Sequence, residues 1–202
     1  MITAKGTVTR QRIVDGAAAE IRAHGATATT LDDVLARTAT SKGQLFHYFP
    51  GGREELLLAV ADYESERVLQ DQQPYLGQLD SWDAWQSWRD AVVRRYRQQG
   101  VHCPLGTLIT ELGRYSPAAR AVTGRLIERW QGDLQAGIAV MQQRGRISAD
   151  LDAARTAAAI VAAIQGGVTI LMSTGSSQHL EAALDTMLLF LHGQASSPAV
   201  VP

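Results

Sequence analysis

Residues 41–49 of the chain read Ser-Lys-Gly-Gln-Leu-Phe-His-Tyr-Phe, and this stretch decides the fold of the N-terminal part. Ser41 is a favoured N-cap, so it predicts a helix from Lys42 to about Tyr48. Leu45 and Phe49 are four residues apart and are expected on the same, inward side of that helix. The side chains left to face outward are those of Lys42, Gln44, His47 and Tyr48.

The preceding segments predict two further helices. In residues 9–24 an apolar residue recurs every four positions, and Gly25 follows as a natural helix end; the recurring residues are Ile13, Ala17 and Ile21. Thr30 can cap a second, short helix, and a break follows at residues 38–40. Two short helices joined by a tight turn and buttressed by a third are typical of a helix-turn-helix.

The outward residues of segment 41–49 suit contacts with DNA. Gln44 can form a bidentate contact with adenine, and Lys42 can reach a guanine edge or a phosphate. Gly43 removes a side chain where the helix would meet the DNA backbone, and hydroxyls can donate to phosphates; these hydroxyls belong to Thr30, Ser41 and Tyr48. On geometry alone, a solvated polar face on a small helical bundle remains an equal alternative.

Residues 9–61 resemble the DNA-binding domain of the TetR family of bacterial repressors. The resemblance lies in the opening Thr9-Arg10-Gln11-Arg12-Ile13-Val14, in Gly25, in Thr29-Thr30-Leu31, in Ser41-Lys42-Gly43 with Leu45-Phe46-His47-Tyr48-Phe49, and in Glu54-Glu55-Leu56-Leu57. It implies a DNA-binding set of Thr29, Thr30, Ser41, Lys42, Gly43, Gln44, Phe46, His47, Tyr48 and Arg53, with Arg53 meeting a phosphate.

The long turn Pro50-Gly51-Gly52-Arg53, the stretch His102-Cys103-Pro104-Leu105-Gly106-Thr107-Leu108 and Glu111-Leu112 look like the LmrA/YxaF-like branch of that family. Four positions depart from the family pattern. Ala39 replaces the usual turn glycine, so the turn must avoid positive φ or tolerate strain. Thr40 replaces an apolar residue, Gln44 suggests a distinct operator, and Phe46 lacks the hydroxyl that often contacts a phosphate.

The rest of the chain also predicts helices, since the six prolines of the whole chain lie at segment edges or in the tail. We expect an all-α fold of about nine helices. We predict a helix-turn-helix domain in residues 1–52, a ligand-binding and dimerisation domain in residues 53–194, and a disordered tail in residues 195–202. Ser81, Ser116-Pro117, Asp152 and Ser177 mark the starts of the later helices.

The second domain offers flat aromatic side chains and a pliable methionine, which suit a planar, apolar ligand. The predicted ligand-binding residues are Trp82, Trp85, Trp88, Tyr96, Cys103, Leu108, Trp130 and Met141. For any single one of these residues, core filling is the more frequent role. The family resemblance implies that an inducer bound in this domain moves the fourth helix and changes the distance between the two reading heads.

The last two helices carry more apolar residues than one buried face requires, which predicts a four-helix seam between two protomers. The predicted interface residues are Ile160, Ile164, Val168, Leu171, Leu184, Met187, Leu188 and Leu191. An intramolecular core is the alternative, and both can hold at once. Gly166-Gly167 is expected to allow close helix approach.

Composition limits the remaining classes of function. The net charge is −1, and residues 1–49 carry six basic against four acidic side chains, a difference of +2, so DNA binding must depend on local charge. Cys103 is the only cysteine, which excludes an intrachain disulfide, and the histidines lack metal-ligand spacing. No phosphate loop, dinucleotide fingerprint or nucleophile elbow is present.

The sequence shows no signal-peptide pattern, and we expect no uncharged apolar run long enough to span a bilayer. These patterns predict a cytoplasmic location. We therefore predict a homodimeric repressor that binds a palindromic double-stranded DNA operator, is released by a small-molecule inducer and needs no cofactor. The alternative is a helical small-molecule carrier or enzyme whose N-terminal helices are only a scaffold.

Overall fold

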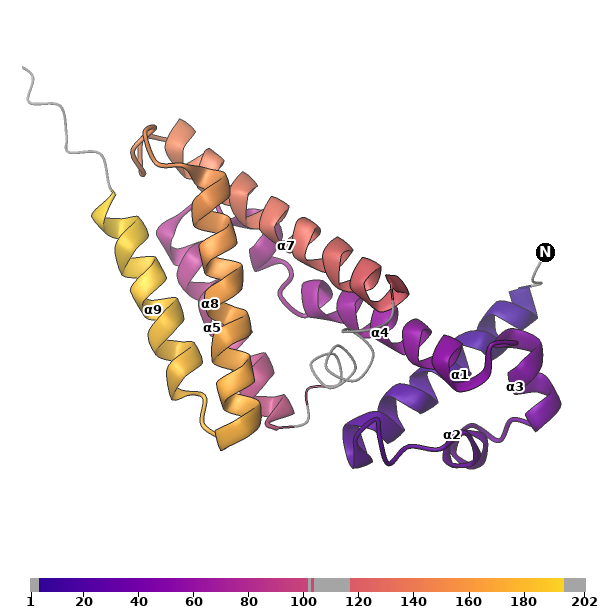
Figure 1. Ribbon diagram of the computed structural model, residues 1–202. Helices are drawn as coiled ribbons and strands as arrows, with labels where there is room; N and C mark the ends of the chain where they lie inside the picture. Colours follow the sequence, from indigo (N-terminus) through magenta and orange to yellow (C-terminus); the bar gives the residue numbers. More distant parts are fainter. Residues whose placement is uncertain (1–3, 102, 104–116, 195–202) are drawn as a thin grey trace, which may run out of the picture. The chain divides into compact units, whose positions relative to one another are not determined.

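The computed structural model describes residues 4–101, 103 and 117–194. Within these ranges all regular structure is helical and no strand occurs, which confirms the prediction of an all-α fold (Figure 1). The helices are α1 (Ala4–His24), α2 (Leu31–Thr38), α3 (Lys42–Tyr48), α4 (Gly52–Gln70), the 3-10 helix η1 (Tyr75–Gln78), α5 (Trp82–Gln99), α7 (Pro117–Gln143), α8 (Ala153–Thr174) and α9 (Gln178–Gly193). Leu108 and the tail 195–202 lie outside the described residues.

The chain forms two compact units. Among the described residues, unit 1 holds residues 4–67, 103 and 117–125, and unit 2 holds residues 68–101 and 126–194. Unit 1 therefore extends beyond the predicted domain end at Gly52. The reason is that apolar residues of α4 complete its core, namely Leu56, Leu57, Val60 and Ala61.

Four helices begin at the caps that the sequence predicts. In each case a side-chain oxygen of the N-cap residue accepts a hydrogen bond from the backbone N–H three residues later, which satisfies a donor that the helix itself leaves free. The cap residues are Thr30, Ser41, Ser81 and Asp152. Local sequence thus fixes where α2, α3, α5 and α8 start.

Two local expectations need correction or completion. The first helix begins at Ala4 rather than near Thr9, although Gly6 in this first segment is a weak helix former. Ala39, between α2 and α3, has φ 48° and ψ 43°, which is the left-handed region. The turn without glycine could either avoid positive φ or tolerate strain, and at Ala39 the chain adopts the strained, positive-φ conformation.

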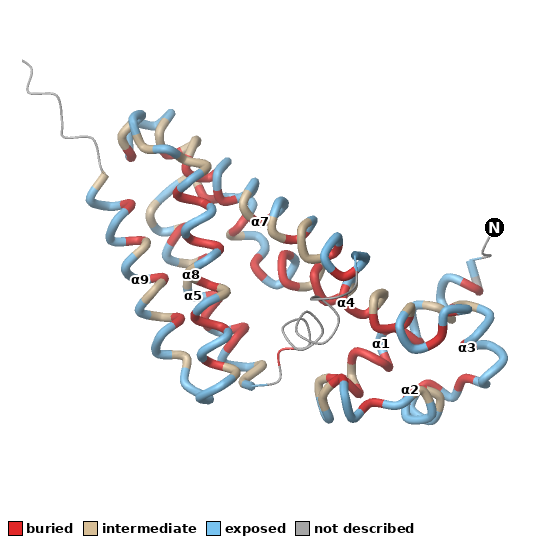
Figure 2. The backbone as a smooth tube through the Cα atoms, viewed as in Figure 1, coloured by how far each residue is buried: buried red, intermediate tan, exposed pale blue. Residues whose placement is uncertain are grey.

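Unit 1 buries one continuous apolar core. Residues of α1 and α4 form most of it, and Val34 of α2 and Leu45 of α3 also belong to it. Figure 2 shows the buried positions on these helices. A partly buried ion pair between Arg22 and Glu64 joins α1 to α4: the Glu64 side chain is 1% exposed and the Arg22 side chain 33%. Arg53 at the start of α4 donates to the carbonyl oxygen of Ala26 at 2.5 Å.

Unit 2 is built on large buried aromatic side chains. Gln72, which follows α4 and is fully buried, accepts hydrogen bonds from Trp88 Nε1 at 2.7 Å and from Trp130 Nε1 at 3.1 Å. Its own amide donates to the Val68 carbonyl oxygen at 2.7 Å. One buried amide therefore ties the end of α4 to α5 and α7.

Helices α8 and α9 lie side by side in unit 2 (Figure 1). A Cβ placed on Gly167 would lie 2.6 Å from the Leu180 Cα, so this glycine permits the close approach, whereas Gly166 faces open space. By length and composition α8 is able to cross a membrane, so the expectation that no uncharged apolar run is that long was wrong. Its buried side packs within unit 2.

Candidate nucleic-acid interface

Helix α3 is fixed to unit 1 by two side chains that are fully buried. Leu45 and Phe49 both have 0% exposure, and the guanidinium of Arg10 lies 5.0 Å from the centre of the Phe49 ring. The backbone N–H of Phe49 donates to the Leu45 carbonyl oxygen at 2.8 Å, so both anchors belong to one rigid turn. These contacts set which side of α3 faces solvent.

The opposite side of α3 is open to solvent. Its exposed residues are Ser41, Lys42, Gly43, Gln44, Phe46 and His47, whereas Tyr48 is half-buried (Figure 2). The His47 and Tyr48 rings meet edge to face with their centres 4.8 Å apart. Unit 1 therefore presents a short helix with one basic, one amide, one imidazole and one apolar side chain turned outward.

Ser41 and Gln44 form a reciprocal capping box. The Ser41 hydroxyl oxygen accepts from Gln44 N at 3.2 Å, and Gln44 Oε1 accepts from Ser41 N at 3.1 Å. The side-chain oxygen of Gln44 thus already uses one of its two lone pairs. Its Nε2 group stays available as a donor, so a bidentate contact with adenine would have to share Oε1 with the helix cap.

Three residues of the predicted DNA-binding set are held by partners within unit 1. Thr29 is buried and its hydroxyl donates to the Gly25 carbonyl oxygen at 2.8 Å. The exposed Thr30 donates its hydroxyl to Asp33 at 2.6 Å. Arg53 donates to the carbonyl oxygen of Ala26. In this state the three side chains stabilise the loop before α2.

The charges at the starts of α2 and α3 differ. The first turn of α2 carries Asp32 and Asp33, and the Thr30 hydroxyl bond lowers the pKa of Asp33, which keeps that carboxylate charged. The first turn of α3 carries no acid and begins with Lys42. A phosphate would therefore be attracted to the start of α3 and repelled from the start of α2.

Phe46 places a phenyl ring on the otherwise polar face of α3. Its side chain is 40% exposed, and it lies over Gly52, where an added Cβ would meet the ring at 3.4 Å. Such a ring cannot donate to a phosphate, but it can contact the methyl group of thymine. Sequence reasoning identified the missing hydroxyl at Phe46 and not this apolar contact.

Polar contacts that sequence reasoning missed hold α2 against α1. Glu20, near the end of α1, accepts from Arg37 of α2 and pairs with His24 Nδ1 at 2.8 Å. The Arg37 hydrogen bond lowers the pKa of Glu20 below its ordinary value of 4.5. Glu20 and Arg37 are far apart in sequence and belong to no motif, so only the packing of the helices reveals the cluster.

Most of the predicted ligand-binding residues fill the core of unit 2. Trp85, Trp88, Trp130 and Met141 have 0% exposure, and Tyr96 has 3%. Cys103 is also buried, in unit 1. Trp82 is half-buried and lines a surface pocket together with Met141. The structure therefore brings two of the predicted residues, Trp82 and Met141, to one pocket and buries Trp85, Trp88, Tyr96, Cys103 and Trp130.

The predicted interface residues of α8 and α9 are mostly buried within unit 2 itself. Ile160, Ile164, Val168 and Leu171 are at most 4% exposed, and so are Leu184 and Leu191; Leu188 is 7% exposed and Met187 is half-buried. They form the intramolecular core that was the alternative interpretation. Other apolar residues on these helices remain exposed, namely Ile170, Leu189 and Phe190.

Comparison with known proteins identifies the family. Residues 13–60, which contain α2 and α3, match the family model for bacterial regulatory proteins of the tetR family. Residues 82–187, more than half of the chain, match the model for the tetracyclin repressor-like C-terminal domain. The chain belongs to the TetR family.

Individual relatives of this TetR-family chain are also regulators. An HTH-type transcriptional regulator of Mycobacterium tuberculosis is 34% identical over 134 residues, which cover 60% of this chain and 64% of the relative, so the chain spans less than two thirds of that relative's length. The regulator YxaF of Bacillus subtilis is 26% identical over 64% of this chain and 69% of its own length.

A solved structure shares the fold along almost the whole chain. The crystal structure of a TetR transcriptional regulator from Chloroflexus aurantiacus has a TM-score of 0.79 and 27% identity, and the match covers 95% of this chain and 98% of that one. The matched families and relatives are transcriptional regulators and not enzymes.

Proposed function

We propose that this TetR-family protein is a DNA-binding repressor that a small molecule releases from a palindromic operator. The observation that carries the proposal is the division of α3 between fully buried Leu45 and Phe49 and an exposed face with Lys42, Gln44 and His47. A rigid helix with such a face is what the major groove admits, since each base pair presents donors and acceptors there.

The contacts that we propose with DNA depend on whether each side chain is exposed or already hydrogen-bonded within unit 1. Lys42 is exposed and would bind a phosphate or a guanine edge, and the Gln44 amide would donate to a base. Phe46 would contact a thymine methyl group. Thr29, Thr30 and Arg53 would act mainly by holding the loop before α2, with Arg53 still able to offer its remaining N–H groups to a phosphate.

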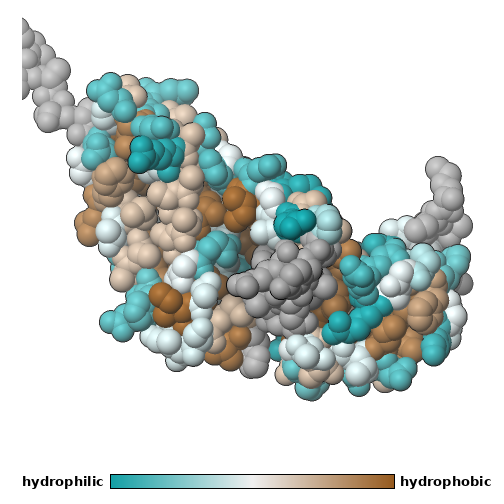
Figure 3. Space-filling model, viewed as in Figure 1, coloured by the Kyte–Doolittle hydropathy of each residue, from teal (hydrophilic) through white to brown (hydrophobic). Residues whose placement is uncertain are grey.

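A palindromic operator requires two copies of the reading head. We propose that the exposed side of α8 and α9 forms the dimer contact. On α8 it has a stripe of small residues at helical spacing, Ala158, Ala162 and Gly166, followed by Ile170, and on α9 it has Leu189 and Phe190. Figure 3 shows apolar and near-neutral residues over these two helices. Two reading heads would then enter successive major grooves roughly 34 Å apart.

Release by a ligand requires that the ligand bind one arrangement of the protein more tightly than another. The aromatic interior of unit 2 favours a planar, apolar compound. We further propose that the protein acts in the cytoplasm and regulates a drug-efflux or detoxification gene. We also propose that it belongs to the LmrA/YxaF-like branch of the family. The competing function, a ligand carrier with a scaffold domain, would leave the exposed face of α3 without a role.

The deciding experiment is selection of random duplex DNA by the purified full-length protein. We expect one enriched palindrome, whose affinity falls steeply as salt rises because bound phosphates release counterions on binding. The matched comparison uses Arg94→Ala, an exposed residue on α5 in unit 2, which should leave the selection unchanged. Recovery of no preferred sequence at low salt would count against a repressor and favour the carrier.

A further inference from the structure

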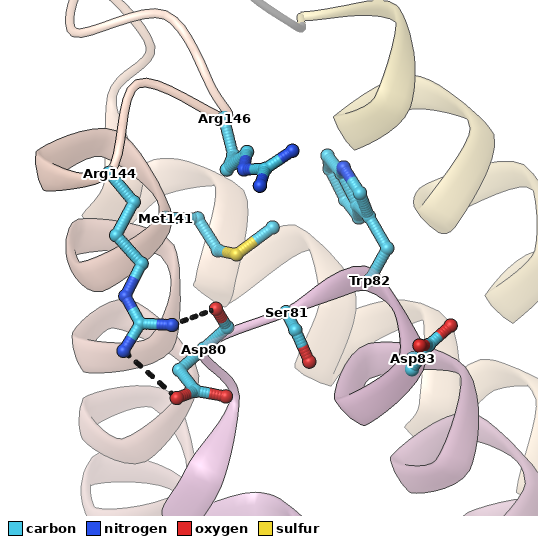
Figure 4. A pocket seen from close by; sticks show the side chains of 7 residues that line it. All are labelled: Asp80, Ser81, Trp82, Asp83, Met141, Arg144 and Arg146. Atoms are coloured by element: carbon cyan, nitrogen blue, oxygen red, sulfur yellow. Dashed lines mark hydrogen bonds and ion pairs between the residues drawn. The ribbon is translucent and has the colours of Figure 1, made fainter.

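Unit 2 contains a pocket of about 520 Å³ where α5 begins and α7 ends. The turn that follows α7 forms one wall, and the first turn of α5 forms the other (Figure 4). Met141, which is fully buried, lies at its base. The pocket falls within the range of about 300–1,000 Å³ that is typical of small-molecule sites.

The turn after α7 is held rigidly by its backbone. The N–H groups of Arg146 and Ile147 both donate to the Met141 carbonyl oxygen, at 2.9 Å and 3.4 Å, and the Ile147 side chain is 1% exposed. Gly145 has φ 66° and allows the chain to reverse there. The backbone of this turn therefore holds the Cα of Arg146 at the rim of the pocket that its side chain lines.

The charges around the pocket leave one cation without a partner. Arg144 donates to the Asp80 carbonyl oxygen at 2.7 Å and its Nη2 lies 2.9 Å from Asp80 Oδ2, so the charge of that carboxylate is matched. Among the residues that the structure describes, the Arg146 side chain has no hydrogen bond or ion pair. Asp83 lies away from Arg146 in Figure 4. The pocket thus offers a free guanidinium to an anion.

A flat aromatic surface lies opposite this guanidinium. The Trp82 indole stacks on the His192 ring, with centres 3.7 Å apart and planes at 22°. In Figure 4 the indole is seen nearly edge-on, and both Arg146 and Met141 lie on one side of it. The stacked histidine fixes the orientation of the ring. Met141, buried at the base of the pocket, supports this surface from below.

We propose that this pocket binds a planar aromatic acid. The aromatic part would lie against Trp82, and the carboxylate would accept hydrogen bonds from two N–H groups of Arg146, since guanidinium and carboxylate match in a bidentate pair. A neutral or cationic compound would leave the Arg146 charge unused. The site makes the predicted class of ligand more specific: planar and acidic rather than planar and apolar. The role of such a ligand as inducer rests on the proposed repressor function.

Calorimetric titration of the full-length protein tests the site. The probe is 2-naphthoate, and the neutral comparison is 2-naphthamide, which has the same shape. We expect 2-naphthoate to bind with a Kd below about 1 mM, as is usual for a ligand of this size. The natural protein should bind 2-naphthamide about tenfold more weakly than 2-naphthoate, because the neutral amide cannot form the charge-assisted hydrogen bonds. The variant Arg146→Gln should bind 2-naphthoate about tenfold more weakly than the natural protein does, for the same reason.

Two control variants keep the result interpretable. Arg94→Gln removes another exposed arginine, which lies outside the pocket, and should leave the affinity for 2-naphthoate unchanged. Trp82→Leu should weaken both probes, and its melting temperature shows whether the fold survives. Equal affinity of the natural protein and Arg146→Gln for 2-naphthoate, or the absence of binding at about 5 mM probe, would overturn the site.

Operator binding gives a separate readout. If 2-naphthoate binds through Arg146 but no operator can be selected, the site stands and the proposed repressor function fails. If an operator is selected while 2-naphthoate does not bind, the repressor stands and the aromatic-acid site fails.

Discussion

Gly16 of α1 lies directly against the methyl group of Thr38 in α2: a Cβ built on Gly16 would be 2.1 Å from Thr38 Cγ2. Thr38 cannot easily turn aside, because it is 6% exposed and its hydroxyl donates to the Val34 carbonyl oxygen at 2.7 Å. This close approach sets how tightly the helix-turn-helix packs on the helix that supports it.

Gly16→Ala is therefore expected to destabilise the protein by about 1–3 kcal/mol through overpacking. Thr38→Ser removes the methyl group, keeps the hydroxyl, and should restore most of the stability when it is combined with Gly16→Ala. A double-mutant cycle of urea unfolding measures this coupling. Additive effects of the two substitutions would show that the methyl group of Thr38 does not limit the packing of α1 on α2.

Ala39 carries the backbone strain of the turn between α2 and α3. Its φ of 48° costs an L-residue about 1–2 kcal/mol, and glycine would avoid this cost. Part of that gain is offset because glycine is more flexible in the unfolded chain. Ala39→Gly should therefore raise the free energy of unfolding by about 0.5–1 kcal/mol. The control is Ala36→Gly, an exposed position inside α2, which should lower it by a similar amount. If both Ala39→Gly and Ala36→Gly destabilise the protein, Ala39 is not strained.

Glu20 makes the stability of unit 1 sensitive to acid. The Arg37 hydrogen bond lowers its pKa below 4.5, so its ionised form is favoured by folding. The resulting stabilisation is present above the pKa of the unfolded chain and is lost as the pH falls through the lowered pKa. Urea unfolding at about pH 7 and about pH 3.5 should thus show a smaller decrease of stability for Glu20→Gln than for the natural protein.

The control for this measurement is Glu54→Gln. Glu54 is exposed and has no ion-pair partner among the described parts of unit 1, so its replacement should leave the acid sensitivity unchanged. Identical pH dependence of Glu20→Gln and the natural protein would mean that the cluster with Arg37 does not stabilise the fold.

Lys42 and Gln44 should separate operator affinity from operator specificity. Lys42→Ala is expected to weaken binding to all sequences and to reduce the salt slope by about one, because one phosphate would no longer be neutralised. Gln44→Ala is expected to relax base preference at one position of each half-site, because a bidentate pairing with a base carries about 1–3 kcal/mol of discrimination. Binding assays over a salt series and a repeated DNA selection measure the two effects.

Gln44→Ala also removes half of a capping box, so its unfolding must be measured beside its binding. Gln44→Glu keeps an oxygen for the Ser41 N–H and serves as the matched variant: it should keep the cap and still change base preference. An unaltered selection profile in both variants would remove Gln44 from the set of base-reading residues.

Leu189 tests the proposed dimer surface. Its side chain is 71% exposed on α9, so Leu189→Glu should not disturb the core of unit 2. If a second copy covers this face, a buried unpaired charge there should convert the dimer into monomers. Sedimentation or light scattering measures the mass, and Arg94→Glu on α5 is the control. A dimer that persists in Leu189→Glu would place the interface elsewhere.

Local sequence was enough to predict the helices of unit 1 and, for α2 and α3, the residues at which they start. Capping residues, apolar spacing and glycine positions act within a few residues of one another, so Ser41, Leu45 and Phe49 sufficed to predict α3 and its buried side. The same local information could not decide whether Trp85 or Trp130 lines a ligand site or fills the core, because both roles require an apolar ring on one helix face.

Tertiary packing assigned those roles. Gln72 joins Trp88 and Trp130 although they are 16 and 58 residues away from it, and Arg146 stands beside Trp82 only because the turn after α7 reaches the start of α5. The exposed side of α8 likewise depends on which side α9 covers. Such pairings of distant residues follow from how helices pack, and packing selects among faces that local sequence leaves equivalent.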